Sequence, residues 1–180
     1  MGTKKSGQNE VTVETRLSGM IELIDETIRS VRRISSELRP SILDDLGLIA
    51  ALEWQGNDFS KRTGITLTFT NKIPDFNPDP NTATQVFRIF QESLTNIARH
   101  SQATEIDIQL YPLTDRAILE ITDNGKGFDP EKSKDKNTLG LLGMKERCVL
   151  FEGLLTIESK IGNGTKVIVT IPNKTNLPAL

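Results

Sequence analysis

The sequence predicts an α+β domain in which helices cover one face of a mixed β-sheet. From residue 48 onward, the expected order is helix, strand, helix, two strands, helix and two strands. This order is not a series of βαβ units, and it favours helices gathered on one side of a largely antiparallel or mixed sheet. A length of 180 residues with 36% hydrophobic residues is sufficient for one packed core.

Charge and cysteine content narrow the functional classes. The formal net charge of −2 provides no broad basic surface, so we expect no nucleic-acid partner. One cysteine and one histidine exclude an internal disulfide and a zinc cluster. No apolar stretch approaches the ~18 residues of a membrane span. We therefore expect a cytoplasmic chain without membrane contact, and the full-length protein could still be membrane-anchored.

Residues 11–39 are expected to form a long helix with a heptad seam. Apolar residues recur from Leu17 to Leu38 in six steps over 21 residues, a mean spacing of 3.5. Pro40 ends this pattern because proline cannot continue a helix. Such a narrow stripe predicts packing against another helix, and no second long heptad helix exists in the chain. The expected remaining segments are a disordered or tag segment at 1–10, a turn-like linker at 40–47, the main domain at 48–173 and a tail at 174–180.

The first half of the main domain is expected to contain two helices and one strand. A helix over residues 48–62 ends at Gly64, a residue suited to the left-handed conformation that terminates helices. The strict alternation of residues 65–70 predicts a half-buried strand. A proline-rich loop over 71–80 precedes a helix over 81–100, whose apolar positions recur with helical spacing.

The second half is expected to contain four strands and one short helix. Strands are expected at 105–110 and 117–122, followed by a polar loop over 128–139 and a helix from Gly140 to about Leu150. Two final strands, 154–159 and 166–171, are joined by a turn at Gly162-Asn-Gly164.

Three polar residues of the 81–100 helix, Glu92, Asn96 and His100, are spaced by four and therefore lie in one row. A carboxylate and an amide one turn apart supply the oxygen ligands that Mg²⁺ prefers. A solvated helix face is the alternative interpretation, and by itself it is the more common outcome of such spacing.

Three glycine motifs follow this helix. Asp123-Asn-Gly125-Lys-Gly127 follows a strand and could be a simple turn or a site where the backbone approaches a planar ligand, with Asp123 accepting a hydrogen bond from an exocyclic amine. Gly140-Leu-Leu-Gly143 opens a helix, where free N–H groups favour phosphate. Gly162-Asn-Gly164-Thr165 could be only a hairpin turn.

The ordered set of these four motifs resembles the ATP-binding fold shared by gyrase, the Hsp90 chaperones, histidine kinases and MutL, known as the Bergerat or GHKL fold. The resemblance narrows with three segments: Gln91-Glu-Ser-Leu-Thr-Asn-Ile-Ala-Arg-His-Ser-Gln-Ala, Gly140-Leu-Leu-Gly-Met-Lys-Glu-Arg and Leu38-Arg-Pro-Ser-Ile-Leu-Asp-Asp-Leu-Gly-Leu. These segments are similar to two-component sensor histidine kinases of the nitrate-sensor and membrane-fluidity-sensor class. The implied fold is a two-layer α/β sandwich preceded by the second helix of a dimerisation and phosphotransfer hairpin.

The resemblance implies a role for each candidate residue. Asn96 would coordinate Mg²⁺, and Glu92 would support the metal through a water or orient a water. Asp123 would recognise adenine, and the loop between Gly127 and Gly140 would be the ATP lid. The remaining nucleotide-binding positions would be Arg99, His100, Gly125, Gly127, Gly140, Leu141, Gly143 and Thr165.

The resemblance also implies a homodimeric full-length kinase that passes a phosphoryl group to a response regulator with LuxR-type output. The acceptor histidine that such kinases carry on the first hairpin helix has no counterpart here, since His100 is the single histidine. Either this chain starts after that helix or the protein has lost it, and the unpartnered heptad seam favours the former. We therefore expect ATP binding without autophosphorylation. The alternative function is a non-kinase ATP-binding switch or an anti-sigma-type protein.

Overall fold

A computed structural model describes residues 19–20, 24, 41–130 and 139–172. The expected heptad helix, the two terminal segments and residues 131–138 of the expected lid lie outside the described residues, except for Gly19, Met20 and Ile24, which are helical. The chain divides into two units, residues 1–40 and 41–180, and the second contains all the elements below.

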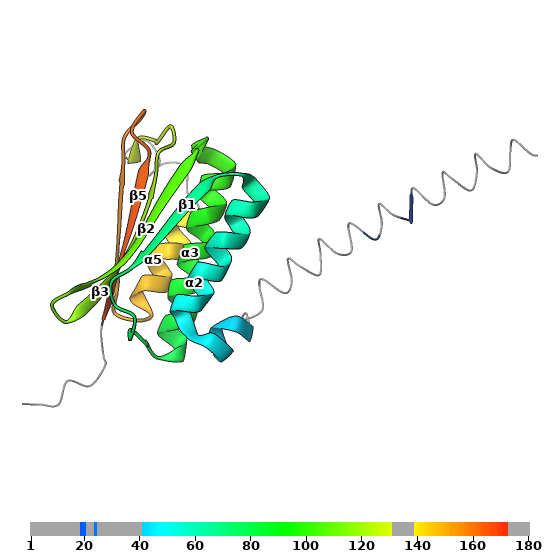
Figure 1. Cartoon of the computed structure of the whole chain (residues 1–180). Helices are drawn as coiled ribbons and strands as arrows, with labels where there is room; N and C mark the ends of the chain where they lie inside the picture. Colours follow the sequence, from blue (N-terminus) through cyan, green and yellow to red (C-terminus); the bar gives the residue numbers. More distant parts are fainter. Residues whose placement is uncertain (1–18, 21–23, 25–40, 131–138, 173–180) are drawn as a thin grey trace, which may run out of the picture. The chain divides into compact units, whose positions relative to one another are not determined.

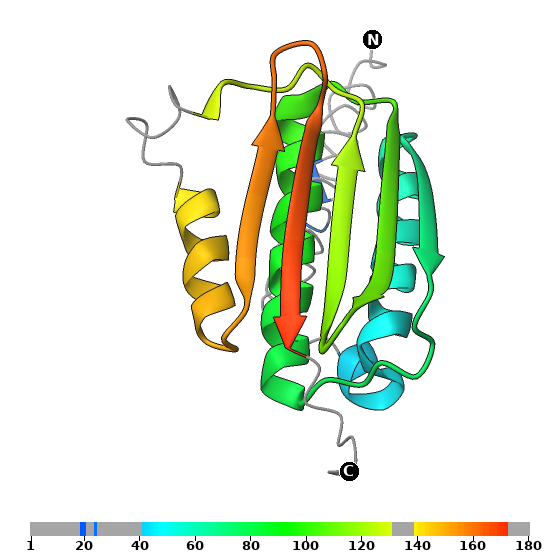
Figure 2. The ribbon, with the colours of Figure 1, turned by 90° about the vertical axis from the view of Figure 1, so that its left-hand side faces the viewer.

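The described strands form one five-stranded sheet in the order β1-β2-β3-β5-β4. Its strands are β1 (Thr66–Asn71), β2 (Glu105–Leu113), β3 (Arg116–Asp123), β4 (Leu154–Ser159) and β5 (Thr165–Pro172). β1 and β2 are parallel, and the other neighbouring pairs are antiparallel. Figure 2 shows this order across the face of the sheet, from β4 in orange to β1 in teal. The predicted mixed sheet is thus confirmed.

The helices α2 (Ser41–Thr63), α3 (Pro80–Asn96) and α5 (Leu139–Val149) lie on one face of the sheet. In the two ribbon views, α3 lies behind the middle of the sheet, between α2 and α5 (Figures 1 and 2). The two-layer α+β arrangement predicted from the element order is therefore confirmed.

The core lies between α3 and the inner face of the sheet. Phe87 and Phe90 of α3 are fully buried, as are Leu119 of β3 and Val169 of β5. Alternate residues of β3 at 117, 119, 121 and 123 are all buried, as expected for a strand with one face toward a core. This packing holds α3 and the end of β3 in a fixed relationship.

The segment expected to be a turn-like linker is mostly helical. Residues 41–46 form the first part of α2, and the chain bends at Gly47, where φ is +78°. Leu43 in this first part is 5% exposed and belongs to the core. The interruption is therefore limited to Gly47, and Gly64, with φ +76°, follows the end of α2 as predicted.

The helix expected over residues 81–100 differs at both ends. It begins at Pro80 because the carboxylate of Asp79 accepts hydrogen bonds from the backbone N–H groups of Asn81 and Thr82. After Asn96, the turn η1 (Ile97–Ser101) is π-helical. A π-helical turn places one more residue in each hydrogen-bonded ring than an α-helix. The predicted row of Glu92, Asn96 and His100 therefore passes from α-helical into π-helical geometry between Asn96 and His100.

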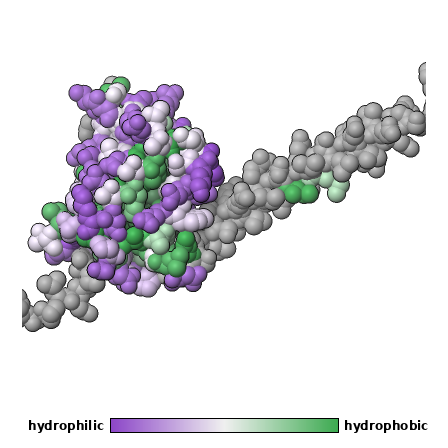
Figure 3. Space-filling model, viewed as in Figure 1, coloured by the Kyte–Doolittle hydropathy of each residue, from purple (hydrophilic) through white to green (hydrophobic). Residues whose placement is uncertain are grey.

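The surface in Figure 3 is mostly hydrophilic, with apolar residues gathered toward the lower end of α2. Leu46 and Trp54 of α2 are among the exposed large apolar side chains. None of the helices in the described part of the chain has the length and apolar content needed to cross a bilayer.

Candidate functional site

Asp123 is a buried carboxylate at the end of β3. It is 4% exposed, and its Oδ1 accepts a hydrogen bond of 2.8 Å from the backbone N–H of Gly125. Burial raises the pKa of Asp123, and hydrogen bonds from the backbone N–H groups of Gly125 and Thr165 offset part of that rise. A buried acceptor of this kind favours a ligand that donates an N–H.

At three positions around Asp123, the neighbouring backbone leaves no room for a side chain, so these positions require glycine. A Cβ on Gly125 would meet the carbonyl oxygen of Ser101, and one on Gly127 would meet that of Lys160. A Cβ on Gly164 would meet the carbonyl of Asp123 itself. Gly127 and Gly164 also have φ of +59° and +73°. These glycines therefore allow two loops to pack onto Asp123, and the interpretation that Gly125 and Gly127 let the backbone approach a planar ligand stays a prediction.

Two serines that the sequence analysis missed hold these loops together. The Oγ of Ser101 donates to the carbonyl of Ile97 at 2.8 Å, and its own carbonyl accepts from the N–H of Lys126 at 2.8 Å. Ser159 Oγ accepts from the N–H of Phe128 at 2.9 Å, and it lies 3.0 Å from Thr165 Oγ1. The predicted nucleotide residue Thr165 thus lies beside Asp123, its partner in the sheet. No periodicity or motif in the sequence marks either serine.

The remaining residues of the predicted polar row lie on α3 and η1. Glu92 and Asn96 are half-buried on α3, one turn apart. Arg99 and His100 are exposed on η1. Since Lys126 binds to Ser101 at the end of η1, the row begins next to the Asp123 loop and runs away from it along α3.

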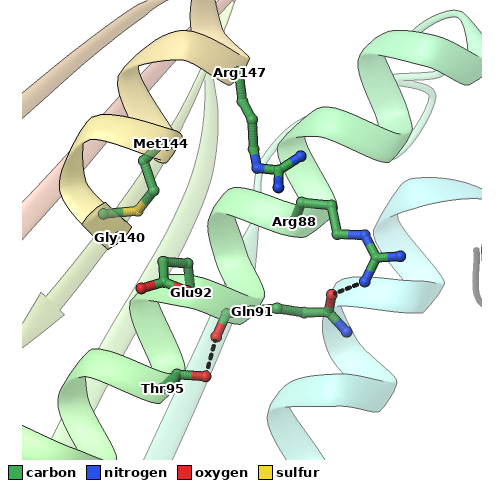
Figure 4. Close-up of a pocket in the computed structure, with 8 residues that line it drawn as sticks. Arg88, Gln91, Glu92, Thr95, Gly140, Met144 and Arg147 are labelled. Atoms are coloured by element: carbon green, nitrogen blue, oxygen red, sulfur yellow. Dashed lines mark hydrogen bonds between the residues drawn. The ribbon is translucent and has the colours of Figure 1, made fainter. Parts of the chain in front are cut away.

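A groove of about 260 Å³ lies between α3 and α5. Both helices contribute residues at positions i, i+3, i+4 and i+7, which share one helix face. The lining residues are Arg88, Gln91, Glu92 and Thr95 from α3, with Gly140, Gly143, Met144 and Arg147 from α5. Figure 4 shows Glu92 pointing toward the end of α5 that holds Gly140, and Arg147 reaching from α5 toward α3.

Three of the residues predicted to bind the metal or the nucleotide line this groove, and other predicted site residues lie outside it. Glu92, Gly140 and Gly143 line it, whereas Asn96 does not. A Cβ on Gly140 would meet Oε1 of Glu92, and one on Gly143 would point into open space. Leu141, predicted at the nucleotide, is partly buried and packs against the hydrophobic core.

The donor atoms present suit the cofactors that the sequence predicts. Glu92 and Asn96 offer carboxylate and amide oxygens, the ligand types that Mg²⁺ prefers. Among the described residues there is no cluster of three or more His, Cys, Asp or Glu side chains for a metal. A site made by these two residues would therefore leave most ligand positions to water and phosphate oxygens.

Residues 81–175 match the family model of the histidine kinase-, DNA gyrase B-, and HSP90-like ATPases. The chain is 38% identical to the sensor histidine kinase MctS of Rhizobium johnstonii, over 88% of this chain and 34% of that protein. It is 40% identical to the signal transduction histidine-protein kinase/phosphatase DegS of Bacillus subtilis, over 74% of this chain and 36% of that protein. The chain thus spans about a third of the length of these relatives.

The fold is similar to a solved histidine kinase domain from the blue-light activated histidine kinase of Erythrobacter litoralis. The TM-score is 0.58 at 16% identity, covering 68% of this chain and 59% of the other. This likeness concerns the fold, while the family match and the two relatives concern the sequence. The chain therefore belongs to the histidine kinase-, DNA gyrase B- and HSP90-like ATPase family and contains the catalytic, ATP-binding domain of a sensor histidine kinase.

Proposed function

We propose that this chain binds Mg²⁺-ATP and transfers the γ-phosphoryl group to a histidine outside residues 41–172, for relay to a response regulator. The single observation that best supports the nucleotide site is the buried carboxylate of Asp123, held by the backbone N–H of Gly125. An adenine amino group would donate to this carboxylate, whereas the O6 acceptor of guanine would leave it unsatisfied.

The chain's own residues would bind and orient the nucleotide. Asp123 would fix the base, and Glu92 and Asn96 would face the phosphates farther along α3. Bound Mg²⁺ would neutralise charge on the phosphate oxygens. In the transfer, the bond between the γ-phosphorus and the bridging oxygen breaks, an imidazole nitrogen forms the new bond to phosphorus, and ADP leaves. Positioning supplies much of the rate of such reactions.

His100 is not the proposed acceptor. It lies four residues after Asn96 on the same helical segment, in η1, and so belongs to the part of the chain that would hold the nucleotide. An acceptor must instead approach the γ-phosphorus from the side opposite the leaving oxygen. We therefore propose that this chain alone does not autophosphorylate.

The oligomeric state, the kinase class, the type of response regulator and the location are properties of the full-length protein. We propose a homodimeric kinase of the nitrate-sensor and membrane-fluidity-sensor class that acts on a regulator with LuxR-type output, in the cytoplasm. The Leu38-Arg-Pro and Gly140-Leu-Leu-Gly-Met-Lys-Glu-Arg segments support this class. Heptad spacing between residues 17 and 38 supports pairing of helices between two copies.

Incubation with γ-labelled ATP tests the proposal. The chain alone should acquire no acid-labile, base-stable label, whereas a separate fragment of the full-length kinase that carries a candidate acceptor histidine should become labelled. Asn96→Ala in the chain should abolish that labelling, and His100→Gln serves as the control for the internal histidine. Stoichiometric label on the isolated chain that disappears in His100→Gln would contradict the assignment. ATP binding without transfer to any fragment would favour the non-kinase switch.

A further inference from the structure

Two Asn-Gly sequences lie next to Asp123, and their surroundings differ. One is Asn124-Gly125, in the loop that follows β3, and the other is Asn163-Gly164, in the turn between β4 and β5 at the top of Figure 2. An asparagine before glycine is chemically labile, because glycine has no side chain to hinder attack of its backbone nitrogen on the asparagine amide. The contacts of each pair therefore decide whether it reacts.

Hydrogen bonds hold both reacting groups of the first pair. Oδ1 of Asn124 accepts from the backbone N–H groups of Thr104 at 2.9 Å and Glu105 at 3.0 Å, and its Nδ2 donates to Thr104 Oγ1 at 2.9 Å. The N–H of Gly125 donates to Asp123 Oδ1 at 2.8 Å. Attack by the Gly125 nitrogen would require these bonds to break, so the fold protects Asn124.

The second pair lacks these restraints. Asn163 is exposed, and in the part of the chain that the structure describes its side chain makes no hydrogen bond. Its backbone N–H donates to the carbonyl of Lys160 at 2.9 Å, which leaves the side-chain amide able to rotate. Gly164 is buried, yet its N–H has no acceptor among the described residues, a rare state for a buried backbone group. This nitrogen is therefore available as a nucleophile.

We infer that Asn163 is a site of spontaneous deamidation through a cyclic imide. The backbone nitrogen of Gly164 loses its proton and attacks the side-chain carbonyl carbon of Asn163. A carbon–nitrogen bond forms in the ring, the bond to the side-chain nitrogen breaks, and that nitrogen takes up a proton and leaves as ammonia. Water then opens the ring at one of its two carbonyl carbons, which gives aspartate or isoaspartate. The reaction consumes water and involves no oxidation or reduction.

The isoaspartate product would disturb the residues around Asp123. Its main chain runs through the side-chain carbons, so it adds a methylene between position 163 and Gly164. Gly164 has no room to move toward Asp123, since even a Cβ on Gly164 would meet the carbonyl of Asp123. Ser159 Oγ donates to the carbonyl of Gly164 at 2.9 Å and lies 3.0 Å from Thr165 Oγ1. Because the packing is tight, a shift of Gly164 reaches the residues proposed to bind the base, a consequence that rests on the proposed function.

Peptide mass mapping of the full chain after incubation in mildly alkaline buffer tests the site. Deamidation raises a peptide's mass by about 1 Da, because a hydroxyl replaces an amide NH₂. We expect this increase, with isoaspartate, at Asn163, and a rate at least about 10-fold lower at Asn124. In denaturant the two rates should become similar, since unfolding removes the hydrogen bonds of Asn124. Asn163→Gln is the matched control, because it keeps an amide but would have to close a larger ring.

Two results of the mass map would overturn the inference. One is deamidation of the native chain at Asn124 as fast as at Asn163. The other is an intact Asn163 in the native chain under conditions in which the denatured chain deamidates at both positions.

Calorimetric titration with Mg²⁺-ATP tests the consequence for the nucleotide site. The separated isoaspartate form should bind ATP at least about 10-fold more weakly than the fresh chain. Asn163→Asp, which adds the charge at an exposed position without lengthening the main chain, should change the affinity less than about 2-fold. Equal affinity of the isoaspartate form and the fresh chain would overturn the coupling to Asp123. If the fresh chain binds no ATP, the proposed function fails, and the mass map alone decides the deamidation site.

Discussion

The carbonyl oxygen of Ser101 accepts a hydrogen bond of 2.8 Å from the backbone N–H of Lys126. This bond joins the end of the helical segment that carries Glu92 and Asn96 to the loop that carries Asp123. Gly125, one residue before Lys126, has no room for a side chain because Ser101 lies against it. The residues predicted for the metal and those predicted for the base are therefore parts of one rigid arrangement.

Two glycine substitutions should have opposite effects on stability. Gly125→Ala places a Cβ against the backbone oxygen of Ser101, and overpacking of this kind costs about 1–3 kcal/mol or more. Gly143→Ala meets open space inside α5 and should stabilise the fold by about 0.5–1 kcal/mol. Urea unfolding of both variants measures this difference. If Gly143→Ala destabilises the chain or Gly125→Ala is neutral, the described loop and helix packing is wrong.

Asp123→Ala should weaken ATP binding and leave GTP binding nearly unchanged. The carboxylate accepts from the amino group of adenine, and the corresponding group of guanine is itself an acceptor, so only ATP loses an interaction. Competition titrations with both nucleotides measure the two affinities. Equal affinity of the parent chain for ATP and GTP would remove this role from Asp123.

The same residue should give the stability a pH dependence of known sign. Burial raises the pKa of Asp123 above its ordinary value of 3.8, so the folded state favours the protonated form. Its contribution to stability is complete below pH 3.8 and is lost as the pH rises through the raised pKa. The free energy of unfolding of the parent minus that of Asp123→Ala should therefore decrease as the pH increases from 3.8. An increase over that range would contradict the burial assigned to this carboxylate.

Asn96→Ala should reduce the affinity for ATP more in the presence of Mg²⁺ than in its absence. The side-chain amide is assigned to the metal, so its removal should change the affinity for metal-free nucleotide only slightly. Calorimetric titrations with and without Mg²⁺ give the two ratios. Matching losses under both conditions would show that Asn96 acts through the fold or through the nucleotide directly.

Cys148 should be unreactive in the folded protein. Its side chain is 2% exposed, and burial raises the pKa of the thiol to about 11. The reactive thiolate is therefore a small minority at about pH 8, and reagents have little access to it. Iodoacetamide should label the chain in denaturant and not in native buffer. Fast alkylation of the native chain would contradict the packing of α5.

Much of the fold could be predicted from local sequence patterns. Alternation predicted β1, and helical spacing from Val86 to Ile97 predicted α3, because burial on one face leaves a periodic trace. The end of α3 could not be predicted in this way. The π-helical turn η1 ends at Ser101, which is hydrogen-bonded to the Asp123 loop, and this partner is distant in sequence and leaves no periodic signal.

Local sequence patterns also predicted part of the candidate site. Asp123 and its glycines form a motif within five residues, so the sequence shows them together. Glu92 and Gly140 are 48 positions apart and line one groove only because α5 packs beside α3. Such pairs carry no local signal, and they become recognisable once the two helices are placed.

Thermal unfolding of this chain with and without Mg²⁺-ATP tests the central claim most directly. Ligand near 100 times its Kd stabilises a fold by about 2.7 kcal/mol. For a domain of this size, that corresponds to a Tm increase of about 5–10 °C. We expect this increase for the parent chain with ATP, and a much smaller one with GTP or in Asp123→Ala. An unchanged Tm of the parent chain in saturating Mg²⁺-ATP would contradict the assignment of an ATP site to Asp123 and α3.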